Sequence, residues 1–144
     1  MTVKEMMKSH LKIMALVAGL LLWTLGLWAQ NVDIAASAEP STVTPGEEFI
    51  YSVRVQGGIS NLPKPQLPAL DQFEILSGPN QSQSFQFING RMSGEVQYSV
   101  GLRCMKPGDY KIAPAEIKVN GKTIKSNEVI VKVTQTSAAN IPSP

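Results

Sequence analysis

The chain has 144 residues, one cysteine, one histidine and a formal net charge of +2. Three of its 13 basic residues and one of its 11 acidic residues lie in the first 12 positions, which leaves 10 of each in the rest of the chain. That balance argues against a nucleic-acid partner, because such proteins present an excess of basic side chains. A single cysteine also excludes a disulfide within the chain.

Residues 1–29 have the features of a secretory signal peptide. Three lysines precede an almost unbroken apolar run over residues 13–29, which ends in the small residue Ala29. We therefore predict cleavage after Ala29. The alternative is an uncleaved signal anchor, because about 17 apolar residues reach the lower limit for a bilayer span. Both interpretations imply that the rest of the chain is exported.

From residue 30 onward the pattern is that of short strands. No window has a sustained apolar repeat of 3.6 residues, and glycine, proline or Asn-Gly recurs about every ten residues. The spacing predicts an all-β sandwich or barrel over residues 30–134. An immunoglobulin-like antiparallel β-sandwich is the fold we expect, in architecture only, because the cysteine and tryptophan hallmarks of antibody domains are missing. The strands expected outside hairpins are 32–38, 47–55, 73–76 and 129–133, with turns at 44–46 and 78–80. Three prolines over 62–70 predict an extended crossover loop between the sheets.

The dipeptide Asn89-Gly90 lies between two runs of alternating apolar and polar residues. Both residues tolerate the positive φ of a type I′ turn, which predicts a hairpin with a two-residue loop. This register pairs Phe87 with Met92 and Phe85 with Gly94. It also places one apolar set on the predicted core face, consisting of Phe85, Phe87, Met92, Val96, Tyr98, Val100, Leu102 and Cys104.

A second hairpin is predicted at Asn120-Gly121, where Ile117 would face Ile124 and Glu116 would face Lys125. After it, residues 135–144 are polar and proline-containing, as is typical of a linker or disordered tail. Between the two hairpins, Gly108 precedes Tyr110 by two residues. This pattern fits a tyrosine corner, in which the phenol bonds an upstream backbone group, or an ordinary turn before a half-buried tyrosine.

Residues 30–144 contain no histidine, which excludes a Ser-His-Asp or Cys-His catalytic arrangement and a histidine-ligated zinc. No calcium-loop or phosphate-loop motif is present, so we predict no catalytic, cofactor-binding or metal-binding residues. Cys104 lies in the apolar phase of its strand, where a buried thiol is inert. If Cys104 were exposed, an intermolecular disulfide would be the alternative. We expect no enzymatic activity.

Two binding interpretations remain open. A carbohydrate-binding or adhesin-type module is disfavoured, because residues 30–144 lack tryptophan, the residue best suited to a sugar platform.

Four lysines, at positions 118, 122, 125 and 132, lie close together in the sequence of the last two predicted ribbons. They could form a docking patch for an acidic partner, or they could protect sheet edges from pairing with other molecules.

The order of several short motifs resembles the N-terminal domain of the BatD oxygen-tolerance (aerotolerance operon) family. They are T-P-G-E-x-F at 44–49, D-x-F-E-I-L at 71–76, I-N-G-R at 88–91, Y-x-V-x-L-R at 98–103, G-x-Y-x-I-x-P at 108–114 and V-N-G-K-T at 119–123. The resemblance spans about residues 32–133. A cysteine at position 104, where the family pattern suggests proline, is a departure.

The resemblance implies a periplasmic envelope protein with immunoglobulin-like domains and no catalytic residues. It further implies assembly with membrane von Willebrand A domain proteins of the same operon and a role in oxygen tolerance. Members usually continue to a C-terminal membrane helix, so this chain is expected to be a fragment or a truncated product. Membrane association would then need an uncleaved leader or that missing helix. From the resemblance we expect a non-catalytic protein-interaction domain.

Overall fold

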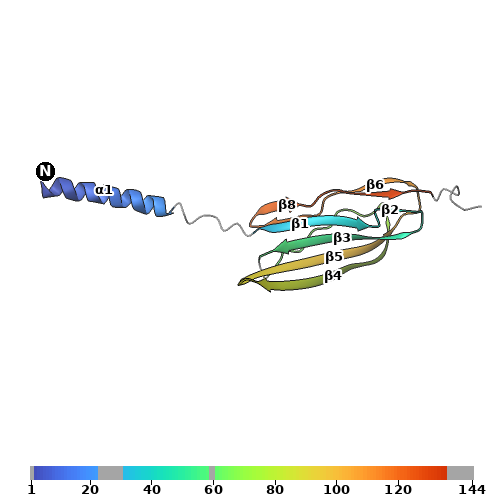
Figure 1. Ribbon diagram of the computed structural model, residues 1–144. Helices are drawn as coiled ribbons and strands as arrows, with labels where there is room; N and C mark the ends of the chain where they lie inside the picture. Colours follow the sequence, from blue (N-terminus) through green and yellow to red (C-terminus); the bar gives the residue numbers. More distant parts are fainter. Residues whose placement is uncertain (1, 23–30, 59–60, 136–144) are drawn as a thin grey trace, which may run out of the picture.

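The computed structural model describes residues 2–22, 31–58 and 61–135, comprising helix α1 (Val3–Leu22) and nine strands (Figure 1). The predicted cleavage site after Ala29 and nearly all of the predicted tail, residues 136–144, lie outside the described residues. In the described part of the chain, no helix combines the length and hydropathy that crossing a membrane requires.

The first layer is a four-stranded antiparallel sheet in the order β1-β3-β5-β4. Its strands are β1 (Val32–Glu39), β3 (Glu48–Gly57), β5 (Arg91–Arg103) and β4 (Glu74–Ile88). The second layer has a three-stranded sheet, β2-β9-β6, and the separate hairpin β7-β8. These strands are β2 (Thr42–Val43), β9 (Val129–Val133), β6 (Gly108–Ile112), β7 (Glu116–Val119) and β8 (Lys122–Lys125). The chain is therefore mostly strand, as predicted, although β2 runs parallel to β9.

Strict alternation of side chains builds the core between the layers. Phe49, Tyr51, Val53 and Val55 of β3 are fully buried, while the residues between them face outward. Val131 of β9 and other residues of the second layer meet them from the other side. Phe49 also packs edge-on against Phe73, with ring centroids 5.4 Å apart.

Both predicted Asn-Gly hairpins are present in the predicted register. Phe87 pairs with Met92 and Phe85 with Gly94, while Ile117 pairs with Ile124 in the second hairpin. The turn residues have φ values of 53° and 74° in the first loop and 50° and 78° in the second. These are the left-handed conformations that a type I′ turn needs, so the turn chemistry alone was sufficient to predict both registers.

The expected turn at 78–80, after a short strand over 73–76, is wrong. These residues belong to β4, which runs unbroken from Glu74 to Ile88 and changes register between Ile75 and Asn80. Gly78 takes a positive φ of 92°, and its missing side chain leaves room for the Ser99 carbonyl. An edge strand can accommodate a proline at such an irregularity, because one side of its backbone is unpaired.

The proline-containing segment 62–70 is extended, as predicted, but it does not connect the two sheets. It joins β3 to β4, two strands of the same sheet. On the way it contacts the second layer, where Gln66 and Glu116 exchange backbone hydrogen bonds of 2.7 and 3.1 Å. The segment therefore helps to cover the core next to β7, and the chain then returns to the first sheet.

The prediction that Phe85, Phe87 and Met92 lie in the core is also wrong. All three lie on the inner side of the first sheet, as the register requires, but they are 52%, 72% and 47% exposed. Figure 1 shows the reason: β4 and the beginning of β5 lie at the edge of the first sheet that is farthest from β6 and β8 of the second layer. Farther along β5 the inner side is covered, and Val96, Tyr98, Val100, Leu102 and Cys104 are buried as predicted.

Candidate functional site

Within residues 2–22, 31–58 and 61–135, no three His, Cys, Asp or Glu side chains are grouped so as to hold a metal ion. Cys104 is buried, as predicted, and its thiol lies 3.5 Å from the Lys106 carbonyl oxygen, to which it donates. A thiol enclosed in this way has little access to a second molecule.

Tyr110 and Tyr51 have environments that indicate a structural role for each side chain. The Tyr110 hydroxyl donates a 2.8 Å hydrogen bond to the Lys106 carbonyl, four residues upstream, which is the tyrosine-corner arrangement. Tyr51 is fully buried, and its hydroxyl has no hydrogen-bond partner among the residues that the structure describes. Burial raises the pKa of Tyr51 to about 12, so its phenol stays protonated at neutral pH.

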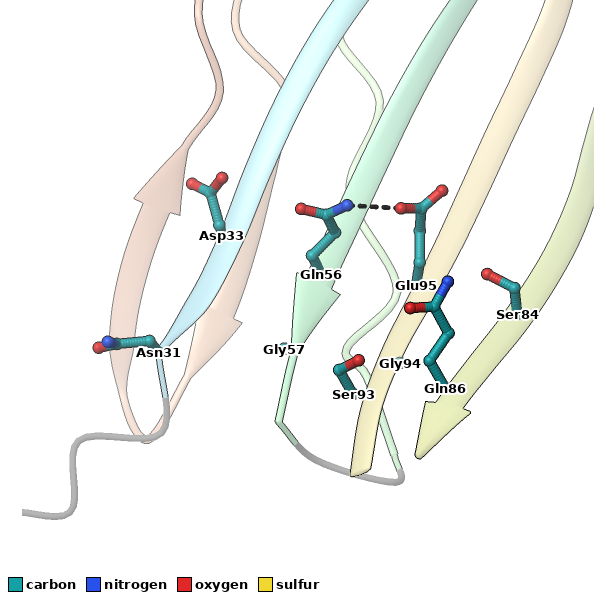
Figure 2. A pocket seen from close by; sticks show the side chains of 9 residues that line it. All are labelled: Asn31, Asp33, Gln56, Gly57, Ser84, Gln86, Ser93, Gly94 and Glu95. Atoms are coloured by element: carbon teal, nitrogen blue, oxygen red, sulfur yellow. Dashed lines mark hydrogen bonds between the residues drawn. The ribbon is translucent and has the colours of Figure 1, made fainter. Parts of the chain in front are cut away.

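The outer face of the first sheet carries a polar hollow of about 400 Å³ at the end nearest the Asn89-Gly90 turn. Figure 2 shows side chains from neighbouring strands projecting to the same side, among them Asp33, Gln56 and Glu95. The other side chains around it are Asn31, Ser84, Gln86 and Ser93. Its remaining lining comes from Gly57 and Gly94, which lie opposite each other and contribute only backbone atoms.

Glu95, which lines the hollow, contacts two side chains of the neighbouring strand β3. It accepts a hydrogen bond from the Gln56 side-chain amide and forms an ion pair with Arg54, whose Nε lies 3.3 Å from Oε1. A second ion pair, between Arg103 and Glu74, joins β5 to β4 at 2.7 Å. The hollow thus offers amide, carboxylate and hydroxyl groups for hydrogen bonding, with no aromatic side chain among its lining residues.

The end of the β4–β5 hairpin is the apolar counterpart of that hollow. Four large apolar side chains gather around one turn: Phe85, Phe87 and Met92 on the inner side, and Ile88, 59% exposed, on the outer side. We call these four residues the hairpin end. Every residue of β4 is exposed. Exposed apolar side chains gathered in this way are typical of contact sites for other molecules.

The lysines of the last ribbons are spread over different strands. Lys125 pairs with Glu116, its cross-strand neighbour, at 3.2 Å. Lys118, Lys122 and Lys132 are exposed on β7, β8 and β9. Each of the short strands β7 and β8 therefore carries lysine, a placement consistent with the protection of sheet edges.

Sequence patterns did not reveal either surface. The hollow combines residues of four strands, and its recognition needs the β1–β3 and β3–β5 registers, which no short turn specifies. The sequence predicted that three of the four apolar residues of the hairpin end share a face. It did not predict their exposure, which depends on how far the opposite layer extends across that face.

Comparison with known proteins places this domain in a family. No curated protein and no solved structure matches the chain. The BatD DUF11 like domain matches residues 36–133, which include all nine strands except the first four residues of β1. The chain therefore belongs to the BatD family, as its motifs suggested.

Proposed function

We propose that this chain is a non-catalytic protein-interaction domain of a BatD-like cell-envelope protein, and that the hairpin end is its contact surface. The observation that carries the proposal is the exposure of Phe85, Phe87, Ile88 and Met92 around one tight turn. Aromatic and methionine side chains are enriched at protein interfaces, where they bury large areas at a low cost in conformational entropy. The closed thiol and the dispersed acids favour binding over catalysis.

The partners we propose are membrane von Willebrand A domain proteins of the same operon, and the assembly would serve oxygen tolerance. Two observations support these partners: the family to which the chain belongs, and the predicted export of residues 30–144 to the periplasm or envelope. The described part of the chain offers the geometry for such a contact, since the hairpin extends beyond the covered core and can enter a groove on another protein.

The test is capture of one identified von Willebrand A protein from solubilised membranes. Replacing both aromatic residues, Phe85→Ser and Phe87→Ser, should reduce capture at least about tenfold, because truncation of an interface anchor costs 1–2 kcal/mol or more. The matched control is Ile130→Ser, which removes an apolar side chain that is 48% exposed on β9. Equal capture by the hairpin variant and the control would contradict the proposed surface.

The polar hollow supports a second candidate, a carbohydrate-binding or adhesin-type module. Asp33, Gln56 and Glu95 present the planar polar groups that bond sugar hydroxyls. Binding of the chain on a glycan array, lost on Gln56→Ala, would favour this candidate. A blank array together with capture of the membrane protein would favour the first.

A further inference from the structure

We propose that the free edge of β4 pairs antiparallel with the same edge of a second copy, which joins the two four-stranded sheets into one. β4 is the last strand of its sheet, and within the part of the chain that the structure describes it has a neighbour on one side only, β5. This inference goes beyond the proposed function, because it concerns the backbone edge of β4 and a different partner.

The geometry of the hairpin determines which backbone groups are free. A two-residue loop closes on a hydrogen-bonded pair, here Ile88 and Arg91, and such pairs alternate along an antiparallel ladder. The residues between them direct their backbone N–H and C=O groups away from β5. Those residues are Gln81, Gln83, Phe85 and Phe87.

This edge lacks the charges that usually prevent pairing between molecules. β4 has no charged residue from Ile75 to Ile88. Apart from the two-residue strand β2, the other strands with a free edge carry two charged residues each: Asp33 and Glu39 in β1, Asp109 and Lys111 in β6, Glu116 and Lys118 in β7, Lys122 and Lys125 in β8. The β1 edge is also covered at Ala36, whose backbone N–H and C=O both bond the Asn127 side chain at 2.9 Å. An uncharged, uncovered strand is a template for another strand.

A second copy fits this template without a like-charge clash. The straight part of β4 runs from Asn80, after the irregularity, to Ile88, before the turn, and its midpoint is Ser84. An antiparallel two-fold pairing about Ser84 places Phe85 opposite Gln83 of the second copy and Phe87 opposite its Gln81. All four residues with free backbone groups then find partners, and both copies keep their inner faces on the same side. The β5 side of each hairpin, with Met92, remains open to another protein.

Ser84 provides the direct test. Its backbone faces β5, so the two copies of Ser84 form a non-hydrogen-bonded pair, the closer type of pair in an antiparallel ladder. Replacing it with cysteine in a Cys104→Ala background should give a covalent dimer when oxidant is added to the full chain. Ser82→Cys, off the two-fold axis, and Ser37→Cys, on the opposite edge of the same sheet, are the controls. α1 is present in all of these proteins and affects them equally.

We expect Ser84→Cys to cross-link at least about tenfold faster than either control, because pairing raises the effective concentration of the two thiols to about the millimolar range. Adding Gln83→Pro should abolish the difference. The N–H of Gln83 is free in the single chain, so proline there preserves the β4–β5 ladder but blocks a strand from another molecule. Far-UV circular dichroism checks that this variant is folded.

Cross-linking at Ser84 no faster than at Ser37 would overturn the inference, and so would undiminished cross-linking in a folded Gln83→Pro variant. Neither result bears on capture of a membrane protein through the hairpin end. Conversely, failed capture with rapid cross-linking at Ser84 would contradict the proposed function and leave the self-pairing intact.

Discussion

The registers of the two Asn-Gly hairpins were predicted by the same reasoning, but the apolar sides of the two hairpins are buried to different extents. β7–β8 packs its apolar side against the rest of the domain, and Ile117 is 1% exposed. β4–β5 has the same turn and an equally exact register, yet Phe87 is 72% exposed. A turn determines which side chains share a face. Whether that face is buried depends on the strands that lie across from it, which are distant in sequence.

The largest expected effect contrasts Ile117 with Phe87. Ile117→Ala should lower the free energy of unfolding by about 2–5 kcal/mol, because it removes a buried side chain and leaves a cavity. Phe87→Ala should change it by less than about 0.5 kcal/mol, since that ring is mostly in water. Urea denaturation of the two variants and the wild type measures both values. A large loss from Phe87→Ala would mean that the hairpin end is covered.

The buried side chain of Tyr51 should make the stability of the covered part of the domain depend on alkaline pH. Its pKa is raised from 10 to about 12 by burial, so its contribution to stability is fully present below pH 10 and is lost as the pH rises to about 12. The expected loss is about 2–3 kcal/mol. Tyr51→Phe should remove this part of the alkaline dependence. The variant should also be about 1 kcal/mol more stable at neutral pH, because it removes an unsatisfied buried hydroxyl.

The measurement is denaturant unfolding of wild type and Tyr51→Phe at pH 8, 10 and 11.5. The difference between the two proteins isolates Tyr51 from the lysines and other tyrosines that titrate in the same range. Parallel stability curves for the two proteins across this range would contradict the assignment.

Most of the local structure was open to prediction, and most of the surface was not. The φ values of the Asn-Gly loops, the alternation in β3 and the burial of Cys104 follow from residue types and spacing. The continuity of β4 through Gly78 did not, because a Gly-Pro pair is equally compatible with a turn and with an irregular edge strand. The polar hollow needed the registers of three strand pairs at once.

The turns themselves should respond alike in the two hairpins. Gly90→Ala and Gly121→Ala each force a side chain into a positive φ, and in neither case would the added Cβ meet another atom within 4 Å. Each substitution should therefore cost about 1 kcal/mol, whatever the burial of the adjoining strands. Thermal unfolding of the matched pair tests this. A cost in β7–β8 several times that in β4–β5 would show that burial, and not the turn, determines the penalty.

The smallest effect is expected at the surface of the covered hairpin. Glu116→Gln breaks the 3.2 Å ion pair with Lys125, but both side chains are substantially exposed to solvent. Its cost should be below about 0.5 kcal/mol and should vanish in high salt. A double-mutant cycle with Lys125→Gln separates the pair energy from the single changes. A salt-independent coupling above 1 kcal/mol would place the pair in a drier environment than the structure describes.

Oxidative footprinting of methionine tests the central claim, that the hairpin end is exposed in the free chain and covered in the proposed envelope assembly. Met92 belongs to the hairpin end, and Met105, 63% exposed beyond the end of β5, is the internal reference. We predict that both methionines oxidise readily in the free chain, and that Met92 alone is protected at least about fivefold when the chain is captured with the proposed membrane partner. Equal oxidation of Met92 in the free and captured chain would contradict the account.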